Sequence, residues 1–561
     1  MKRLLFAFFL SISSVLTVQA QIHLRYNHAG YHPNRIITLV AMSESSLEGK
    51  PWKLLSSGDS ITSGKLSRHK TSQGDHTPFL YNYEVTLPAL QVQGEYNFVL
   101  EESTISFEVS EKPYAKYVNS VVRYLRQQRS GTPEALDHLP GHFEDSIAKI
   151  WTKGSGEQEW QSTSRKANVI GGWYDAGDYL KFTLTNAYTV YNLLRAYEAN
   201  PEIFQTKNYA NGPYSDLLDE AKFGLDYLER CLVDDSTFII QVGNEVDHQQ
   251  GNRLPHLDKN AGNRGAYSAM SKPQLAFCAA DFALASHIFK TDSTLSKRYL
   301  ALAIKLFDLA EKSTTSAWYQ KDHEVFYDDK NPLDNLLLAA SELARVSDNP
   351  YYLKQVKHYV FEAKQGYWAA WGDYHLQAQL RAFPFESKAM RYVAQDMMTF
   401  QANANHTNNI FGVPHEYTWA SLYSMIIVAN GGAYADFMRN NNTYQGLSQD
   451  VLDYVLGKNN WGVSFLAHPD LKPAVSNIYS QVYKLQPRLY PLGAVAEGPG
   501  DKKTHDELQQ WFSISRENYE RFAPFNTEKV VFFDDHSDFQ CMETTIGGLS
   551  DLILLIALME R

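Results

Sequence analysis

The sequence of 561 residues is several times the length of a typical domain, and its 44% hydrophobic and 20% charged residues are typical of globular domains with ample cores. The formal net charge of −11 argues against nucleic acid and anionic membrane surfaces as partners. Aromatic residues make up 13% of the chain, and this excess favours a carbohydrate partner, because flat rings stack on the faces of sugars.

The first twenty residues have the pattern of a secretory signal peptide. Lys2 and Arg3 form a basic start, an apolar stretch runs to Leu16, and small residues surround the end of the segment at Ala20. The apolar stretch is too short for a comfortable membrane span, and no later segment is long enough for one. We therefore expect residues 1–20 to direct export, and the protein to act as a monomer without a membrane span, in the periplasm or outside the cell.

Three cysteines are scattered through the chain, at Cys231, Cys278 and Cys541. An odd number at wide spacing matches neither a disulfide framework nor a zinc site. We interpret them as small buried apolar residues, and the alternative that two of them pair stays open.

Residues 21–112 are predicted to form a β-sandwich of the immunoglobulin type. Short β-branched and aromatic runs, such as "ITLVAM", "FLYNYEVTL" and "ISFEV", alternate with Gly, Ser, Asp and Pro clusters. No catalytic cluster is apparent in this part.

Residues 113–561 are predicted to form an all-α domain. Helical spacing of apolar residues is clearest over 184–198, 214–232, 273–289, 294–312, 334–346, 373–383, 417–429 and 540–559. Strand signals are scarce here. About a dozen helices joined by long loops suit helical hairpins around a centre, and loops of this length are usually functional.

The stretch "GGWYDAGDYLKF" places Asp175 and Asp178 three residues apart, beside Trp173 and Tyr174 and just before an amphipathic run. One aspartate could cap the helix that follows, since Asp is a favoured N-cap. Two carboxylates beside two rings could instead hold a water at a catalytic site. Metal binding has less support, because few ligands lie nearby in the sequence.

A second candidate, Glu543, lies near the end of the chain. Apolar residues at helical spacing form a stripe there: Phe539, Met542, Ile546, Leu549 and Ile553. On such a helix Glu543 lies beside the stripe, one turn from Phe539 and from Gly547. Partial burial would raise its pKa, as a general acid requires, whereas a solvated glutamate at a helix start is the alternative.

Weaker candidates lie in polar or aromatic loops. His248 follows Asp247 in "VGNEVDHQQG", Tyr267 ends a long polar stretch, Trp371 lies in "YWAAWGDYHLQA", and Trp419 lies in "FGVPHEYTWASLYS". Surface exposure or core packing would explain each of them equally well. The sequence contains no P-loop, no nucleotide-binding glycine motif and no serine-nucleophile elbow.

Taken in order along the chain, these segments resemble glycoside hydrolase family nine, the inverting cellulase family with an N-terminal immunoglobulin-like module. "GGWYDAGDYLKF" is close to the family signature GGW-x-DAGDY-x-K-[YF]. "LLDEAKFGLDYL", "VGNEVDH", "DYVLGKNNWGVSFL" and "GAVAEGPGD" resemble later landmarks, and "DDHSDFQCMET" stands where the family has its D-x-x-x-D-[YF]-x-x-N-E block.

The resemblance implies an (α/α)6 barrel of six helical hairpins with an open cleft at its loop end. Asp178 would be the general base, Asp175 would help to hold the attacking water, and Glu543 would be the general acid. An inverting pair has its carboxyl groups about 6.5–9.5 Å apart, which leaves room for the water, and we predict that separation here. No cofactor is required; structural calcium is common in the family, but the sequence assigns no ligands to it and we place no metal.

The chain also departs from the family pattern. Cellulases of the family carry a Pro-His-His-Arg segment where this chain has "LKPAVSNIYSQVYKL". Tyr423 in "WASLY" stands where Arg is frequent, and Met542 precedes the acid where Asn is usual. The acid–base residues are therefore present, while the residues that contact sugars are altered.

We therefore expect a hydrolase of β-1,4-linked glucan or a related glycan, acting as an endoglucanase, with sugar contacts from Trp173, Tyr174, His248, Tyr267, Trp371, Trp419 and Tyr423. One alternative is an exo-acting β-glycosidase of the same family, for example on glucosamine or hemicellulose oligomers. Another is a glycan-binding protein that keeps the fold with little turnover.

Overall fold

The computed structural model describes residues 21–67, 73–153, 160–315, 327, 329, 331–363 and 372–561. The predicted signal peptide at 1–20 and Trp371 lie outside these residues. Within the described ranges, no helix combines the length and the apolar character needed to cross a membrane.

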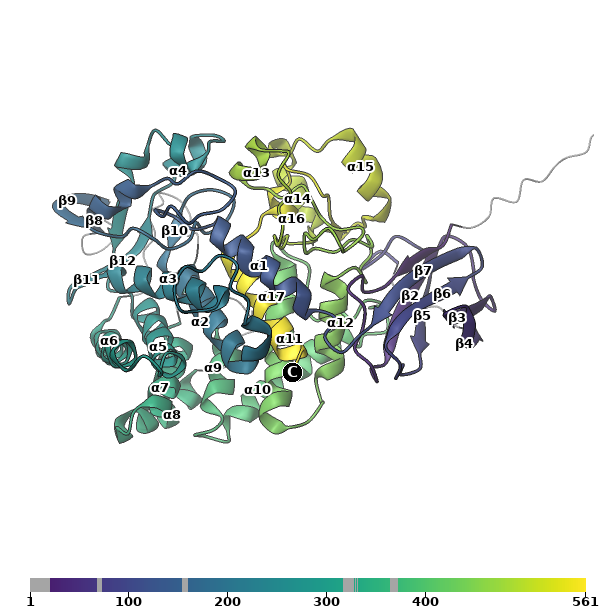
Figure 1. The fold of residues 1–561 in the computed structure, drawn as a ribbon, viewed down its shortest axis with the longest axis horizontal. Coiled ribbons are helices and arrows are strands. Elements are labelled where there is room, and N and C mark those ends of the chain that lie inside the picture. The colour runs from purple at the N-terminus through teal and green to yellow at the C-terminus, as the bar shows by residue number, and fades with distance from the viewer. Residues whose placement is uncertain are drawn as a thin grey trace, which may run out of the picture.

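The N-terminal domain is a β-sandwich of two antiparallel sheets, at the purple end of the chain in Figure 1. One sheet has the strand order β1-β2-β5 and the other β4-β3-β6-β7. The strands are β1 (His23–Arg25), β2 (Ile37–Ser43), β3 (Pro51–Ser56), β4 (Asp59–Lys65), β5 (Tyr81–Leu87), β6 (Gly94–Leu100) and β7 (Ser103–Val109). In β6 alternate residues Tyr96, Phe98 and Leu100 are buried, as the period of a half-buried strand requires. The predicted sandwich is confirmed.

Six helices of the described chain form a closed inner ring, in which each helix packs against the next. They are α2 (Thr183–Ala199), α5 (Lys272–Ile288), α7 (Leu333–Val346), α9 (His375–Ala382), α11 (Ser421–Arg439) and α17 (Ile546–Met559). The ring closes where α17 packs against α2, which brings the end of the chain beside its early part.

An outer layer of helices surrounds this ring. It consists of α1 (Ala115–Gln127), which packs on α17, and of α3 (Asp216–Cys231), α6 (Ser293–Lys312), α8 (Pro350–Glu362), α10 (Ala389–Ala404) and α12 (Gln445–Val455), each of which follows an inner helix. All residues of α17 are buried, because it lies among other helices, whereas α6 keeps a polar face toward solvent. The expected (α/α)6 barrel is confirmed.

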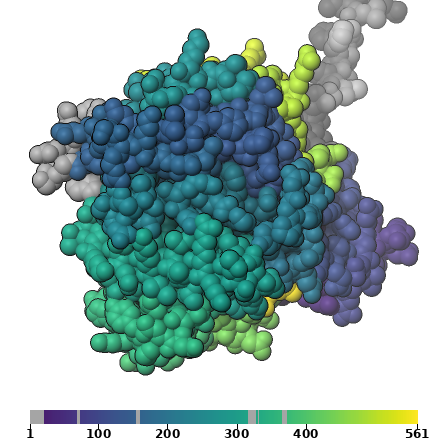
Figure 2. All heavy atoms as spheres, turned by 60° about the vertical axis from the view of Figure 1, so that its left-hand side comes forward, coloured from purple at the N-terminus to yellow at the C-terminus, as the bar shows by residue number. Residues whose placement is uncertain are grey.

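The expectation that strands are scarce after residue 113 is wrong. A six-stranded sheet flanks the barrel, built from β8 (Ala148–Lys153), β9 (Trp160–Ala167), β10 (Lys181–Phe182), β11 (Leu232–Asp234), β12 (Thr237–Val242) and β13 (Gly265–Ser268). Three of them, β10, β11 and β13, have two to four residues, β12 is buried at every position, and β9 is polar at most positions. Few of these strands therefore show the alternation of apolar and polar residues by which a strand is recognised in a sequence. Figure 2 shows the blue part of the chain that includes β8 lying across the teal and green barrel helices.

Further short elements gather at one end of the barrel, the upper end in Figure 1. They include α4 (Val246–Gln249), α13 (Gln481–Leu485), α14 (Lys502–Leu508), α15 (Arg516–Phe522), α16 (Phe539–Met542), β14 (Gly500–Asp501) and β15 (Val530–Val531). Single 3₁₀ turns lie at Phe143–Ile147, Pro201–Phe204, Pro255–Leu257, Ala261–Asn263, Gln509–Trp511 and Ala523–Phe525.

The single helix predicted over 540–559 is in fact two helices. The Asp538 carboxylate accepts a hydrogen bond from the Cys541 amide at 3.1 Å and caps α16, and the Thr545 hydroxyl accepts one from the Gly548 amide at 3.1 Å and caps α17. Between the two helices Glu543 is extended, with φ −68° and ψ 144°. The expectation that Glu543 lies on a helix, one turn from Phe539 and from Gly547, is therefore wrong. Glu543 lies in the short non-helical segment between α16 and α17.

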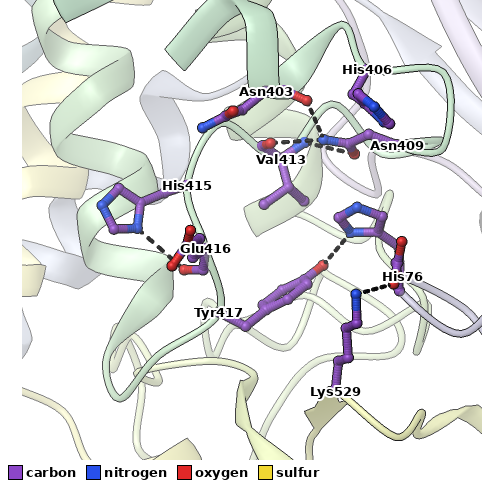
Figure 3. Close-up of a pocket in the computed structure, with 10 residues that line it drawn as sticks. His76, Asn403, His406, Asn409, Val413, His415, Glu416, Tyr417 and Lys529 are labelled. Carbon is purple, nitrogen blue, oxygen red and sulfur yellow. Dashed lines mark hydrogen bonds and ion pairs between the residues drawn. The ribbon is translucent and has the colours of Figure 1, made fainter. Parts of the chain in front are cut away.

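The two domains are joined by specific polar contacts. The His28 amide donates to the Leu456 carbonyl at 2.9 Å, and the Asn27 side chain donates to Asp453 at 2.8 Å. Beside this junction lies a pocket of about 420 Å³ (Figure 3), where His76 of the sandwich domain contacts the Tyr417 hydroxyl at 3.1 Å. The sandwich thereby supports the loop that leads to Trp419.

All three cysteines are buried and free, as interpreted from the sequence, so the alternative that two of them pair is excluded.

Gly547 and Gly548 at the start of α17 offer a matched test of this packing. A methyl group on Gly548 would lie 2.1 Å from Cε1 of Tyr423, whereas one on Gly547 would lie 3.6 Å from the nearest atom of Tyr188. We expect Gly548→Ala to lower the free energy of unfolding by about 1–3 kcal/mol, because the buried ring must move. Gly547→Ala should leave it unchanged or raise it by up to about 1 kcal/mol, through helix propensity. Denaturant unfolding measures both, and equal effects would contradict the packing.

Candidate active site

The loop that carries both aspartates is anchored to the barrel through Trp173. Its amide donates to Asn186 on α2 at 3.0 Å, and its indole N–H donates to Glu220 on α3 at 3.1 Å. Helix α2 begins at Thr183 after an extended Phe182, and no side chain caps it. The alternative that Asp175 or Asp178 caps this helix is therefore excluded.

Asp178 is held as a carboxylate. Its Oδ1 accepts a hydrogen bond from the Leu180 amide at 3.1 Å, and its Oδ2 lies 2.7 Å from Nδ1 of His248 on α4. Burial alone would raise the pKa of Asp178, but the hydrogen bond and positive charge of His248 outweigh it, and the pKa is lowered. Burial would lower the pKa of His248, but the hydrogen bond to Asp178 raises it to about 9.

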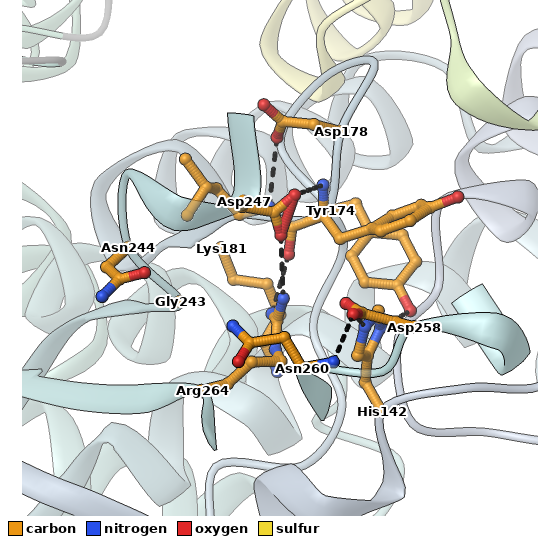
Figure 4. A network of polar contacts seen from close by, with 12 residues as sticks. His142, Tyr174, Asp178, Lys181, Gly243, Asn244, Asp247, Asp258, Asn260 and Arg264 are labelled. Atoms are coloured by element: carbon orange, nitrogen blue, oxygen red, sulfur yellow. Dashed lines mark hydrogen bonds and ion pairs between the residues drawn. The ribbon is translucent and has the colours of Figure 1, made fainter. Parts of the chain in front are cut away.

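A buried charge network fixes the chain directly after Asp178 (Figure 4). Arg264 donates to the Tyr179 carbonyl at 2.7 Å and pairs with Asp247 at 3.3 Å and with Asp145 at 3.1 Å. The Tyr179 amide donates to Asp247 at 3.4 Å. Because Asp247 directly precedes His248, the same network positions both the carboxylate and the imidazole that pairs with it.

Asp175 lies deeper than Asp178 and links the loop to the end of the chain. Its carbonyl accepts a hydrogen bond from the Ile546 amide at 3.0 Å, and its carboxylate accepts one from the Tyr327 hydroxyl. Burial raises the pKa of Asp175 to about 6. The contact with Ile546 joins the aspartate loop directly to the start of α17.

Glu543 reaches the aspartate loop from the break before α17. Its Oε1 accepts a hydrogen bond from the Gly177 amide at 2.9 Å. A side chain at 177 would press against Glu543, since a Cβ there would lie 2.9 Å from the same oxygen and 2.7 Å from the Tyr479 carbonyl. Burial and the negative charge of Asp178 raise the pKa of Glu543 to about 8.

Asp178, whose pKa is lowered, directly follows the glycine that Glu543 contacts, and the pKa of Glu543 is raised. The site therefore places two carboxyl groups of opposite pKa shift close together. Two carboxyl groups whose environments separate their pKa values in this way are suited to serve as base and acid in one reaction. The predicted separation of about 6.5–9.5 Å between the Asp178 and Glu543 carboxyl groups stays a prediction.

Four of the rings predicted to contact sugar are inside the protein. Trp173, Tyr174, Tyr267 and Tyr423 are exposed by 0%, 1%, 2% and 1%. The Tyr174 hydroxyl contacts His142 at 2.6 Å, and the Tyr423 hydroxyl donates to the Val495 carbonyl at 2.7 Å. No face of these rings is open to a sugar, so the prediction is corrected. Trp173, Tyr174 and Tyr423 support the segments that carry the carboxylates, whereas Tyr267 packs against Trp151 and Trp160 in the flanking sheet.

The two other described candidates are open to solvent. The side chain of His248 is 43% exposed, and Trp419 is 42% exposed. The Trp419 indole N–H donates to Glu497 at 2.7 Å, which fixes the edge of the ring. Sugar binding by these two residues stays a prediction, as does that by Trp371.

Two residues of the site had no role in the sequence analysis. Tyr327, which donates to Asp175, has no surrounding motif and lies 152 residues away in the sequence. Glu497, which accepts a hydrogen bond from Trp419, lies in the segment "GAVAEGPGD". An acidic residue surrounded by small residues there could have indicated a buried carboxyl group.

Structural calcium stays unassigned. Over the ranges that the structure describes, no group of three or more His, Cys, Asp or Glu side chains is placed to hold a metal ion. Backbone amides contact Glu543 and Asp178, His248 pairs with Asp178, and the Tyr327 hydroxyl donates to Asp175.

Two carboxyl groups of separated pKa at the loop end of an (α/α)6 barrel are suited to the hydrolysis of a glycosidic bond. The profile of glycosyl hydrolase family 9 matches residues 114–556, which shows that the chain belongs to this family and is a glycoside hydrolase.

Known relatives and solved structures agree with this membership. Endoglucanase 16 of Arabidopsis thaliana is 26% identical over 393 residues, which cover 61% of this chain and 72% of the relative. A xyloglucan-specific endo-β-1,4-glucanase of Bacteroides ovatus is 24% identical over 222 residues, 36% of this chain and 35% of the relative. A crystal structure of a metagenome-derived family 9 endoglucanase superposes with a TM-score of 0.78 at 20% identity, covering 96% of this chain and 99% of that one.

Replacing His248 tests the electrostatics of the base. His248→Ala removes the hydrogen bond and the positive charge that lower the pKa of Asp178, so this pKa should rise. The acidic limb of the kcat/KM profile should then move to higher pH by about one unit. The exposed His256→Ala is the matched control. An acidic limb that stays in place in His248→Ala would show that this pair does not set the ionisation of Asp178.

Proposed function

We propose that the protein is an exported, inverting β-glycoside hydrolase that cleaves a β-1,4-linked glucan or a related glycan. The observation that carries this proposal is the contact of Glu543 with the Gly177 amide, directly beside Asp178, with the two pKa values moved in opposite directions. Both residues are thus in the protonation state that their roles need over a broad range of pH.

In this mechanism Asp178 accepts a proton from a water, and the water oxygen attacks the anomeric carbon. Glu543 gives its proton to the glycosidic oxygen on the other face of the sugar, and the bond from that oxygen to the anomeric carbon breaks. One water is consumed, Asp178 ends protonated, Glu543 ends ionised, and the anomeric configuration inverts. Asp175, fixed by Tyr327 and by its backbone contacts, helps to hold the water.

The substrate class rests on the relatives. Their names describe endoglucanases, one of them specific for xyloglucan, and the acid–base residues stand in the order of the family signatures. Trp419, open to solvent beside the acid, offers a flat apolar face for a pyranose ring. Export rests on the signal-like pattern of residues 1–20.

Glu543→Gln and Asp178→Asn should each lower hydrolysis by about 10²–10⁴-fold, since each removes one proton transfer. Reducing-sugar release from cellulose, xyloglucan, mixed-linkage glucan and glucosamine oligomers measures this, with the exposed Glu507→Gln as control. Proton NMR of the first product should show the inverted, α anomer. A wild type no faster than either variant on every glycan would support a binding protein, and a β product would exclude inversion.

The pH profile should have its basic limb near the pKa of Glu543. The acid is protonated below about pH 8 and loses its proton above it, so kcat/KM should fall as the pH rises through about 8. Initial rates from pH 4 to pH 10 measure this limb. A basic limb near pH 5, the ordinary range of a glutamate, would contradict the role of burial and of Asp178.

A further inference from the structure

A fourth carboxyl group, that of Glu497, lies beside the acid and has no part in the mechanism above. Its backbone amide donates to the Glu543 carbonyl at 3.0 Å, and the next amide, of Gly498, donates to the Cys541 carbonyl at 2.9 Å. The segment around Glu497 therefore pairs with the chain on which the acid is mounted. The Glu497 carbonyl also accepts a hydrogen bond from the Leu422 amide at 3.3 Å, at the start of α11.

The side chain of Glu497 extends this contact to the surface. Its Oε2 accepts from the Trp419 indole N–H at 2.7 Å. Glu497 is 4% exposed, whereas Trp419 is 42% exposed and packs with its ring centroid 5.6 Å from that of Phe539 on α16. Glu497 thus joins an exposed aromatic face on one side to the backbone of Glu543 on the other.

The environment of Glu497 is unusual for a buried acid. Over the described ranges no ion pair neutralises it, and the charges that act on it come from other acids: Glu543, Asp175 and Asp538. Burial and these charges raise its pKa well above the ordinary value. A carboxyl oxygen accepts the indole hydrogen bond in either protonation state, and a buried polar group without a partner would cost stability.

We propose that Glu497 is a positioning residue for the general acid, which holds Trp419 and the Glu543 backbone as one unit. A sugar that stacks on Trp419 is then held at a fixed distance and orientation from the carboxyl group of Glu543, which donates the proton. This inference rests on the proposed function, and it adds a residue that the acid–base mechanism does not require.

Two substitutions separate the hydrogen bond of Glu497 from its ability to ionise. Glu497→Gln keeps an oxygen that can accept the indole hydrogen bond. Glu497→Leu removes this acceptor and leaves a side chain of similar size. On the glycan that the wild type cleaves, Glu497→Leu should lower kcat/KM by about tenfold or more, and Glu497→Gln should stay within about threefold of the wild type. The exposed Glu507→Leu is the matched control, and circular dichroism with thermal melting checks that each variant folds.

A second substrate tests whether the loss acts through the acid. The 2,4-dinitrophenyl glycoside of the same sugar has a leaving group that departs without a proton, so a misplaced acid matters little. Glu497→Leu should lose less than about threefold on this glycoside. Equal losses on both substrates, or no loss on either, would overturn the proposal.

The indole side of the contact has its own test. Trp419→Phe keeps a ring but lacks the N–H, and combined with Glu497→Leu it should cost no more than Glu497→Leu alone, because the two changes remove the same hydrogen bond. Additive losses would overturn the link between the two residues. A loss in Glu497→Gln that is confined to glucosamine oligomers would also overturn it, since Glu497 would then be a ligand for an ammonium group.

Failure of the proposed function is distinguishable from failure of this inference. If the wild type is no faster than Glu543→Gln, hydrolysis itself is absent. Calorimetric titration of Glu543→Gln with oligosaccharide then still tests the link, because binding at Trp419 needs no turnover. Addition of Glu497→Leu to that background should weaken binding several-fold, and unchanged binding would overturn the proposal.

Discussion

The hydrogen bond from the Gly177 amide to Glu543 is the contact on which the site depends, because it joins two loops that are 366 residues apart. It forms only because the inner ring of the barrel closes between α17 and α2, and because the Ile546 amide fastens the same two segments through the Asp175 carbonyl. Glycine at 177 leaves room for the carboxyl group. Closure of the fold and assembly of the site are therefore one event.

Electrostatics divides the roles within this contact. Asp178 and Glu543 are both carboxyl groups beside the same glycine, yet among the described residues only Asp178 has a cationic partner, His248, at 2.7 Å. The charge that this partner stabilises on Asp178 in turn disfavours a charge on Glu543. Arg264 and Asp247 fix the backbone beside Asp178 and His248, while Glu497 links the backbone of Glu543 to Trp419.

The sequence predicted the sandwich and the barrel, because each depends on a local pattern or on signatures in a fixed order. The same signatures indicated three carboxylates that the fold brings together, and their catalytic roles stay predictions. The sequence did not predict the break at Glu543, because the apolar stripe of 539–553 continues across a pair of capped helices. It also assigned Trp173, Tyr174, Tyr267 and Tyr423 to sugar binding, although an aromatic residue beside a catalytic motif serves equally well as its support. Tyr327 and Glu497 reach the site only through the tertiary fold, so no local pattern identifies their partners.

The central claim is tested most directly by titrating Glu543 in the folded protein. Its carboxyl vibration or carbon-13 resonance reports the ionisation, and the signal is assigned by its loss in Glu543→Gln. This group should titrate near pH 8, while the pKa of Asp178 should lie below the ordinary value of an aspartate. Titration of Glu543 near 4.5, the ordinary value for a glutamate, would contradict the claim, since the two carboxyl groups would then carry the same charge at neutral pH.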